Sequence, residues 1–218
     1  MAPLWTNIPT ARRTLQVDAL RFSIRESEIP TGAGPNRWSA DPRQVWVDAQ
    51  NRLHLRLAPD THGIWRSVEV FAEVPLLTQL DFSLYLAEGD LQVGAVASVF
   101  LYRNDGCELD FELSRWGEAG APIAQYAIAP ADSPKRRVRF ALDPTAPSHH
   151  RLNWHDRQVQ WQSWQDGVML KAWYAHGWRV PRFHAHRLHI NLWLLHGTPP
   201  PDGQPIELIV SALKINDL

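Results

Sequence analysis

Hydrophobic and polar residues alternate in short runs along most of the chain. Because successive side chains of a β-strand point to opposite faces of a sheet, this period of two predicts roughly a dozen strands. The 17 prolines lie mainly between the runs, where a proline removes no ladder hydrogen bond. Only residues 170–175 suggest a turn of helix. The main runs are VWVDA, RLHLRLA, SVEVFAEV, LDFSLYL, AVASVFLY, ELDFELS, RVRFAL, VQWQSW, RLHINLWLL and IELIVSALKI.

Many short strands without intervening helices predict an all-β fold, a two-sheet antiparallel β-sandwich of the jelly-roll type. The segments SEIPTGAGPNRWSADP and GTPPPDGQP are rich in glycine and proline, and strand patterns resume directly on both sides of each. They are therefore predicted to be loops and not linkers. We expect residues 1–218 to form a single domain, a size that sandwiches commonly reach.

Charge and composition narrow the possible partners. The 22 basic and 23 acidic residues leave a net charge of -1, which argues against nucleic acid as a partner. No run approaches the roughly 18 apolar residues of a membrane-spanning helix, so no membrane partner is expected. The start MAPLWTNIPTARR lacks the apolar segment of a signal peptide, which predicts a cytoplasmic protein unless a leader has been removed.

The segment CELDFELS carries the chemistry. In a strand, Cys107, Leu109, Phe111 and Leu113 share one face, and the carboxylates Glu108, Asp110 and Glu112 share the other. Like charges this close should raise at least one pKa, which suits a general acid beside an ionised nucleophile. The same pattern fits a strand that shows its acids to water, although no lysine or arginine interrupts the acidic face.

Glu108-Leu-Asp110-Phe-Glu112 resembles the Glu-x-Asp-x-Glu signature of family 16 glycoside hydrolases, the laminarinase, lichenase and agarase-like enzymes with a concanavalin A-like jelly roll. The resemblance implies that Glu108 is the nucleophile, Asp110 assists it and Glu112 is the acid/base of a retaining mechanism. It also implies a secreted enzyme without a cofactor. A structural calcium ion occurs in some relatives, and nothing in this sequence locates one.

Other parts of the chain resemble the family in the same order: GIWRSVEV before the signature, HHRLNWHDRQVQWQSWQDG after it, and then RLHINLWLLHG and IELIVSALKI. Two features depart from the family. SVFLYRND stands where many members have a tryptophan before the first glutamate, and the Tyr-Gly that often follows the Ser-x-Glu strand is missing.

Several residues are candidate sugar contacts. A tryptophan stacks its apolar face on a sugar while its N–H finds a polar partner. Trp193 is expected beside the cleft from its place in NLW, and Trp116 follows the signature closely. The predicted substrate-binding set is Trp193, Trp116, Asn36, Trp38, Arg115, Gln125 and Tyr126.

Other chemistries have weaker support. His184 and His186 share one face of a strand, and His189 lies on the other, but a zinc site needs at least three protein ligands. Cys107, the single cysteine, excludes an internal disulfide and is expected to be a small buried residue. No Gly-x-Ser-x-Gly elbow is present.

The sequence therefore predicts a retaining, endo-acting glycoside hydrolase or transglycosylase for a β-linked glucan or galactan, acting as a monomer on a polysaccharide or oligosaccharide. The alternative is a non-catalytic, lectin-like carbohydrate-binding sandwich, favoured by the missing tryptophan. A third possibility is a structural sandwich whose acids are solvated or bind calcium, although calcium prefers six to eight oxygen ligands. Glu108 and Glu112 are four positions apart, so their Cα atoms lie about 13 Å apart in an extended strand, and a retaining pair requires their carboxyl groups to lean together.

Overall fold

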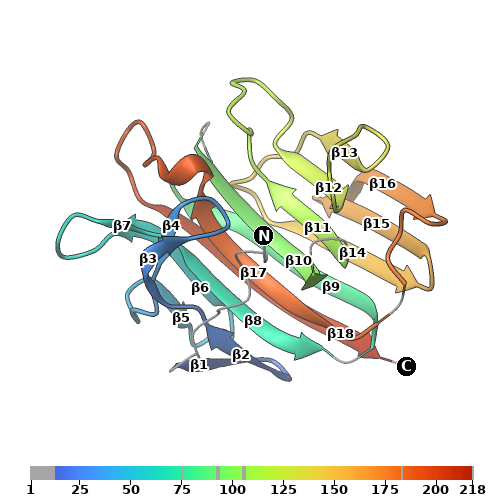
Figure 1. Ribbon diagram of the computed structural model, residues 1–218, viewed down its shortest axis with the longest axis horizontal. Helices are drawn as coiled ribbons and strands as arrows, with labels where there is room; N and C mark the ends of the chain where they lie inside the picture. Colours follow the sequence, from blue (N-terminus) through green and yellow to red (C-terminus); the bar gives the residue numbers. More distant parts are fainter. Residues whose placement is uncertain (1–12, 75, 92–93, 105–106, 183, 218) are drawn as a thin grey trace.

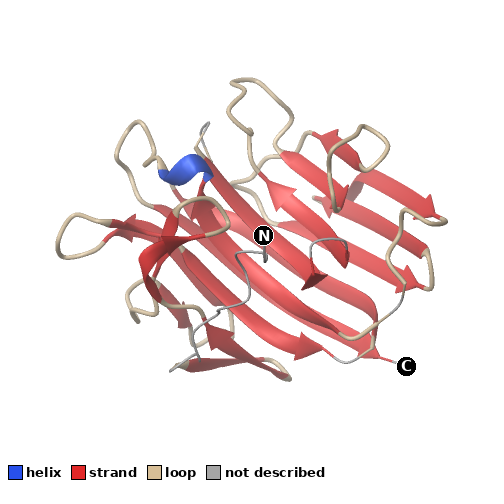
Figure 2. Ribbon diagram, viewed as in Figure 1, coloured by secondary structure: helices blue, strands red, loops and turns tan. Residues whose placement is uncertain are grey.

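The computed structural model describes residues 13–74, 76–91, 94–104, 107–182 and 184–217. Strands make up nearly all of its regular structure, with one short 3-10 helix, η1 (Leu195–Gly197) (Figure 2). The strands are β1 (Thr14–Val17), β2 (Leu20–Ile24), β3 (Ser27–Thr31), β4 (Asn36–Trp38), β5 (Val45–Val47), β6 (Leu53–Pro59), β7 (Trp65–Arg66), β8 (Val68–Val74), β9 (Leu77–Glu88), β10 (Ala95–Asn104), β11 (Cys107–Leu113), β12 (Ala124–Ile128), β13 (Arg137–Phe140), β14 (Ser148–His155), β15 (Gln158–Gln165), β16 (Val168–His176), β17 (His186–Leu194) and β18 (Ile206–Asp217).

Two large antiparallel sheets form the body of the protein (Figure 1). The cleft sheet has the strand order β1-β2-β8-β17-β10-β11-β12-β13, and the back sheet has the order β16-β15-β14-β9-β18-β6-β5 with β7 paired to β6. Strands β3 and β4 form a separate hairpin. This arrangement confirms the predicted two-sheet sandwich.

The core lies between the two sheets and is filled by the residues that the period-two pattern marks as apolar. Phe111 of β11 meets Phe82 of β9 edge to face, with 5.6 Å between ring centroids. Tyr126 of β12 stacks on Trp161 of β15 at 5.8 Å. All four side chains are at most 2% exposed. Aromatic pairs of this kind add to the free energy gained from burying apolar surface.

Two details differ from the expectation. Residues 170–175, where a helical turn is expected, belong to strand β16 at the edge of the back sheet, which pairs with β15. Strands are also more numerous than predicted. Among those not predicted, β7 has two residues and β4 three, too few to show an alternation. Among the described residues, no helix is long and apolar enough to cross a membrane.

Phe111→Ala should destabilise the protein strongly. The ring packs on Phe82, Tyr126 and His150, and its removal leaves a cavity between the sheets. We expect the free energy of unfolding to fall by about 3–5 kcal/mol in urea denaturation. Ile29→Ala, at a side chain that is 70% exposed, is the control and should change it by less than about 0.5 kcal/mol. Equal effects of the two substitutions would contradict this account of the core.

Candidate active site

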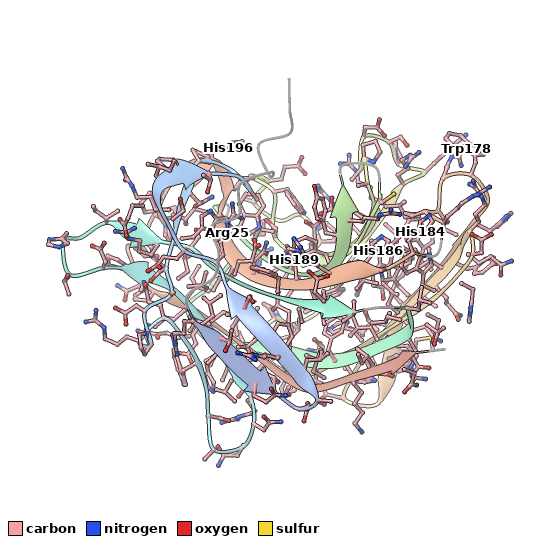
Figure 3. The ribbon with its side chains drawn as sticks, turned by 60° about the horizontal axis from the view of Figure 1, so that its bottom comes forward. Arg25, Trp178, His184, His186, His189 and His196 are labelled. Atoms are coloured by element: carbon pink, nitrogen blue, oxygen red, sulfur yellow. The ribbon has the colours of Figure 1, made fainter. Side chains whose placement is uncertain are left out.

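A cleft of about 560 Å³ opens on the face of the cleft sheet that points away from the core. Six adjacent strands line it, so the cleft runs across the strands and not along them. Figure 3 shows His189 near the middle of this face, with Arg25 to one side and His186 to the other. Five strand spacings of about 4.8 Å give the row from β8 to β13 a width of about 24 Å.

Strand β11 places the three carboxylates in this cleft. Leu109, Phe111 and Leu113 are at most 2% exposed and face the back sheet. Strand alternation then directs Glu108, Asp110 and Glu112 to the opposite face, and all three line the cleft. The predicted acidic row is therefore present, and it faces this cleft.

Asp110 is the most deeply buried of the three, at 7% exposure. Burial, together with the negative charges of Glu108 and Glu112, raises the pKa of Asp110 well above its ordinary value. Asp110 also shares a side-chain hydrogen bond with Glu108. This hydrogen bond raises the pKa of Asp110 further, as it does for a carboxyl group that donates its proton, so Asp110 is the donor and Glu108 the acceptor.

Glu112 titrates near neutral pH. Burial raises the pKa of this carboxyl group to about 7, against the opposing effects of a hydrogen bond from Gln125 and the charge of Arg139. Gln125 Nε2 donates to Glu112 Oε2 at 2.9 Å, and Gln125 Oε1 accepts from Arg139 Nε at 3.0 Å. This relay fixes the orientation of Glu112. A carboxyl group with such a pKa can both give and take a proton at pH 7.

A second buried carboxylate, Glu69 of β8, lies three strands from β11. Burial alone would raise its pKa, but the hydrogen bond from His189 and the charges of His189 and Arg25 lower it below the ordinary value. Because Glu69 is ionised, His189 Nδ1 must donate to Glu69 Oε1, at 3.1 Å. Asn191 Nδ2 donates to Glu69 Oε2 at 3.4 Å. Glu69 thus orients both neighbouring side chains.

His189 and Asn191 line the cleft. Each side chain is 3% exposed, and neither His189 Nε2 nor Asn191 Oδ1 has a hydrogen-bond partner within the described part of the chain. The His189 ring is stacked at 4.9 Å on Phe100 and at 5.6 Å on Phe71. Two fixed polar atoms between aromatic rings are suited to the hydroxyl groups and apolar faces of a sugar.

The cleft floor is aromatic although the upstream tryptophan is missing. Phe100 pairs with Asp110 and Tyr102 pairs with Glu108 across β10 and β11, and both aromatic residues line the cleft. Tyr102 also meets the His189 ring edge-on at 5.8 Å. The segment SVFLYRND therefore supplies an aromatic surface beside the carboxylates.

Three predicted sugar contacts line the cleft: Trp193, Trp116 and Gln125. The loop at Gly34 lies close to Trp193: Gly34 has a positive φ of 60°, and a Cβ added to it would lie 3.3 Å from the Trp193 ring. Only glycine adopts that conformation without cost. The Gln125 side-chain amide donates to Glu112, so its main role in the cleft is to orient that carboxyl group.

Asn36 and Trp38 do not line the cleft, which corrects their prediction. Asn36 is 3% exposed. Its Oδ1 accepts hydrogen bonds from the Leu194 backbone N–H at 3.2 Å and from Ser67 Oγ, and its Nδ2 donates to the Leu194 carbonyl at 2.9 Å. Trp38 is fully buried, donates to the Thr31 carbonyl and stacks under Arg25 at 4.1 Å. Both residues fasten the loop beside the cleft.

Tyr126 and Arg115 also lie outside the cleft lining. Tyr126 is fully buried on the core face of β12, where its hydroxyl donates to Ser163 Oγ at 2.6 Å. Since Gln125 faces the cleft, its neighbour in the strand must face the core. Arg115 donates to the Ala121 carbonyl at 3.3 Å within its own loop.

The prediction missed several cleft residues that the same alternation identifies. Asn191 and His189 lie two and four residues before Trp193, on the same face of one strand. Glu69 belongs to the SVEV run that the family resemblance already marks. Arg137 and Arg139 occupy alternate positions in RVRF and so share one face of a strand. Their closeness to the carboxylates of β11 depends on which strands pair, and a single sequence does not reveal that pairing.

The described residues contain no cluster of three or more His, Cys, Asp or Glu side chains placed to hold a metal ion. His186 is buried, packs edge-on against Trp154 at 4.6 Å and has Nδ1 2.8 Å from the His184 carbonyl oxygen. Its role is in packing. Cys107 is only partly buried, in contrast to its prediction, because it begins β11 at the sheet's end.

No family model and no curated protein matches the sequence. Solved structures do match. The β-glucanase of Bacillus licheniformis is 15% identical with a TM-score of 0.67, covering 99% of this chain and 97% of that one. A family 16 glycosyl hydrolase protein of Mycobacterium smegmatis is 16% identical with a TM-score of 0.66, covering 90% and 93%.

A protein of Mycobacterium tuberculosis described as an immunostimulatory antigen and pseudo β-1,3-glucanase is 15% identical with a TM-score of 0.66, covering 90% and 91%. These likenesses confirm the fold that the family resemblance implies: the chain has the jelly-roll sandwich of β-glucanases and family 16 glycosyl hydrolases.

Glu112 should make the stability of the protein depend on pH. Folding raises its pKa from 4.5 to about 7, so between these values the folded state binds more protons than the unfolded state. The free energy of unfolding must then fall as the pH rises through this window. Glu112→Gln should make this decrease in the free energy of unfolding smaller. Part of the decrease should remain, because the pKa of Asp110 is also raised. Urea denaturation from pH 4 to pH 8 measures both, with exposed Glu88→Gln as the control. An unchanged slope in Glu112→Gln would contradict the assignment.

Tyr126→Phe should affect stability and not sugar binding. The substitution removes the donor to Ser163 Oγ, at a cost of about 1 kcal/mol in the free energy of unfolding. Affinity for any bound polysaccharide, measured by calorimetry, should stay unchanged. Weaker binding at unchanged stability would return Tyr126 to the sugar-contact set.

Proposed function

We propose that this chain is a retaining glycoside hydrolase or transglycosylase that acts within a β-linked glucan or galactan chain. The observation that carries the proposal is that Glu108 and Glu112, in one cleft, have different hydrogen-bond partners and different tendencies to hold a proton. Glu108 accepts a hydrogen bond from protonated Asp110, and Glu112 has a pKa of about 7. Two carboxyl groups with different protonation states are what acid-assisted nucleophilic displacement requires.

In the first step, Glu108 attacks the anomeric carbon while Glu112 donates its proton to the leaving glycosidic oxygen. The Asp110 hydrogen bond holds Glu108 toward the sugar and stabilises its charge before attack. In the second step, Glu112, now ionised, removes a proton from water or from a sugar hydroxyl, whose oxygen attacks the anomeric carbon and breaks its bond to Glu108. The Gln125 contact keeps Glu112 aimed through both steps.

The place of β11 within the cleft supports action inside a polymer. Strand β11 has three cleft-lining strands on one side and two on the other. At about 4.8 Å per strand, this leaves about 14 Å and about 10 Å for sugar units on the two sides of the carboxylates. His189 and Asn191 would bind hydroxyl groups on the wider side.

A second candidate is a carbohydrate-binding protein without turnover. The altered floor, with Phe100 and Tyr102 in place of the upstream tryptophan, favours it. So does the likeness in fold to a protein described as a pseudo β-1,3-glucanase. Both candidates bind a polysaccharide in this cleft, and only cleavage separates them.

Glu108→Gln should abolish cleavage and spare binding, because it keeps the shape of the side chain and removes the nucleophile. New reducing ends from laminarin, lichenan, agarose and carrageenan should fall by about 10³-fold or more on the accepted polymer. Glu112→Gln should lower them by about 10²–10⁴-fold. Glu88→Gln on the back sheet is the control and should cleave normally. Cleavage by Glu108→Gln at the native rate would refute the mechanism, and binding without cleavage by the native protein would establish the second candidate.

A further inference from the structure

Positive charge gathers at the β13 end of the cleft. Residues 130–140 contain four basic side chains and one acidic side chain, in a protein whose net charge is -1. Two of them, Arg137 and Arg139, line the cleft itself. Arg137 pairs across β12 with Ala127, which pairs with Asp110, so two strand spacings of about 4.8 Å separate Arg137 from the carboxylates.

The two cleft arginines differ in their partners. Arg139 donates to Gln125 and lies 3.5 Å from the exposed Glu118, so it serves the Glu112 relay. Arg137 is exposed, and its Nη1 donates to the Ala131 carbonyl at 3.3 Å. Arg137 makes no ion pair with any carboxylate of the described residues. Its guanidinium group therefore has donors left for a ligand.

The positive surface continues past the rim of the cleft. Trp178 is 74% exposed, and the guanidinium groups of Arg136 and Arg179 lie 5.6 and 5.3 Å from its ring centroid. Neither arginine has an ion pair within the part of the chain that the structure describes. Arg136 also donates to the carbonyl of Ala129, a cleft-lining residue, at 2.9 Å. Figure 3 shows Trp178 on the side of the molecule opposite Arg25.

This arrangement fits an acidic sugar polymer. An exposed indole offers a stacking surface for a pyranose ring, and a guanidinium group binds a carboxylate or sulfate through two parallel hydrogen bonds. Three arginines without carboxylate partners repel one another, and an anion between them relieves that repulsion. A neutral glucan would use the stacking surface and leave the three charges uncompensated.

We propose that the cleft takes an anionic polysaccharide, whose carboxylate or sulfate groups bind Arg137 and whose chain continues over Trp178 between Arg136 and Arg179. The inference deepens the proposed function and rests on it only in that the ligand is a sugar polymer.

The test measures binding and does not depend on turnover. Isothermal titration calorimetry of the Glu108→Gln protein with carrageenan, a β-linked polyglucuronate and laminarin compares a sulfated, a carboxylated and a neutral polymer. We expect one of the anionic polymers to bind about tenfold or more tightly than laminarin, as one charge-assisted hydrogen bond provides. Which of the two binds identifies the anionic group. About 0.5 M NaCl should shrink the difference.

Substitutions locate the effect. Added to the Glu108→Gln protein, Arg137→Gln or Arg136→Gln should lower the affinity for the anionic polymer by about tenfold and leave the affinity for laminarin unchanged. Arg21→Gln, at an exposed arginine of β2 away from the cleft, removes the same charge and should have no effect.

Laminarin binding as tight as the anionic polymers, or equal effects of Arg137→Gln and Arg21→Gln, would overturn the inference and leave the glycosidase proposal intact. Binding to none of the three polymers would overturn it as well. Single-stranded RNA bound as tightly as the acidic polysaccharide would show a general polyanion surface and also overturn it. Absence of cleavage together with the expected affinities would refute only the proposed function.

Discussion

Two buried carboxylates on one sheet, held in opposite charge states, are the constraint on which the cleft depends. Asp110 is surrounded by Glu108 and Glu112 and keeps its proton. Glu69, three strands away and equally out of solvent, faces His189 and Arg25 and loses its proton. The sheet therefore presents a hydrogen-bond donor at one place and a fixed anion at another, and each orients the polar groups beside it. Burial strengthens both effects, because screening by water is weak there.

The sequence predicts the sandwich well because a strand alternates every two residues, and a half-buried sheet displays that alternation directly. It predicts the acidic row for the same reason: three apolar residues of β11 must enter the core, so Glu108, Asp110 and Glu112 must leave it. It fails at residues 170–175, because β16 is an edge strand whose side chains are mostly exposed or partly exposed. A strand without a buried face has little hydrophobic period.

Prediction of the sugar contacts was uneven for a physical reason. Trp193 follows from its strand position, whereas Asn36 and Trp38 belong to a loop whose course depends on contacts with distant residues. Tyr126 could have been excluded, since it directly follows Gln125 in one strand and the two cannot share a face. The place of Arg137 in the cleft is not predictable from one sequence, because its distance from the carboxylates is set by the pairing of β11, β12 and β13.

The attachment of Asn36 to Leu194 has a consequence for how the molecule is made. These residues are 158 positions apart, and the loop around Gly34 supports Trp193 only when both are in place. Contacts between such distant residues form slowly, because a long stretch of chain must close first. During synthesis, the early loop emerges well before β17 exists. The side of the cleft that carries Trp193 is therefore among the last parts of the cleft to be completed.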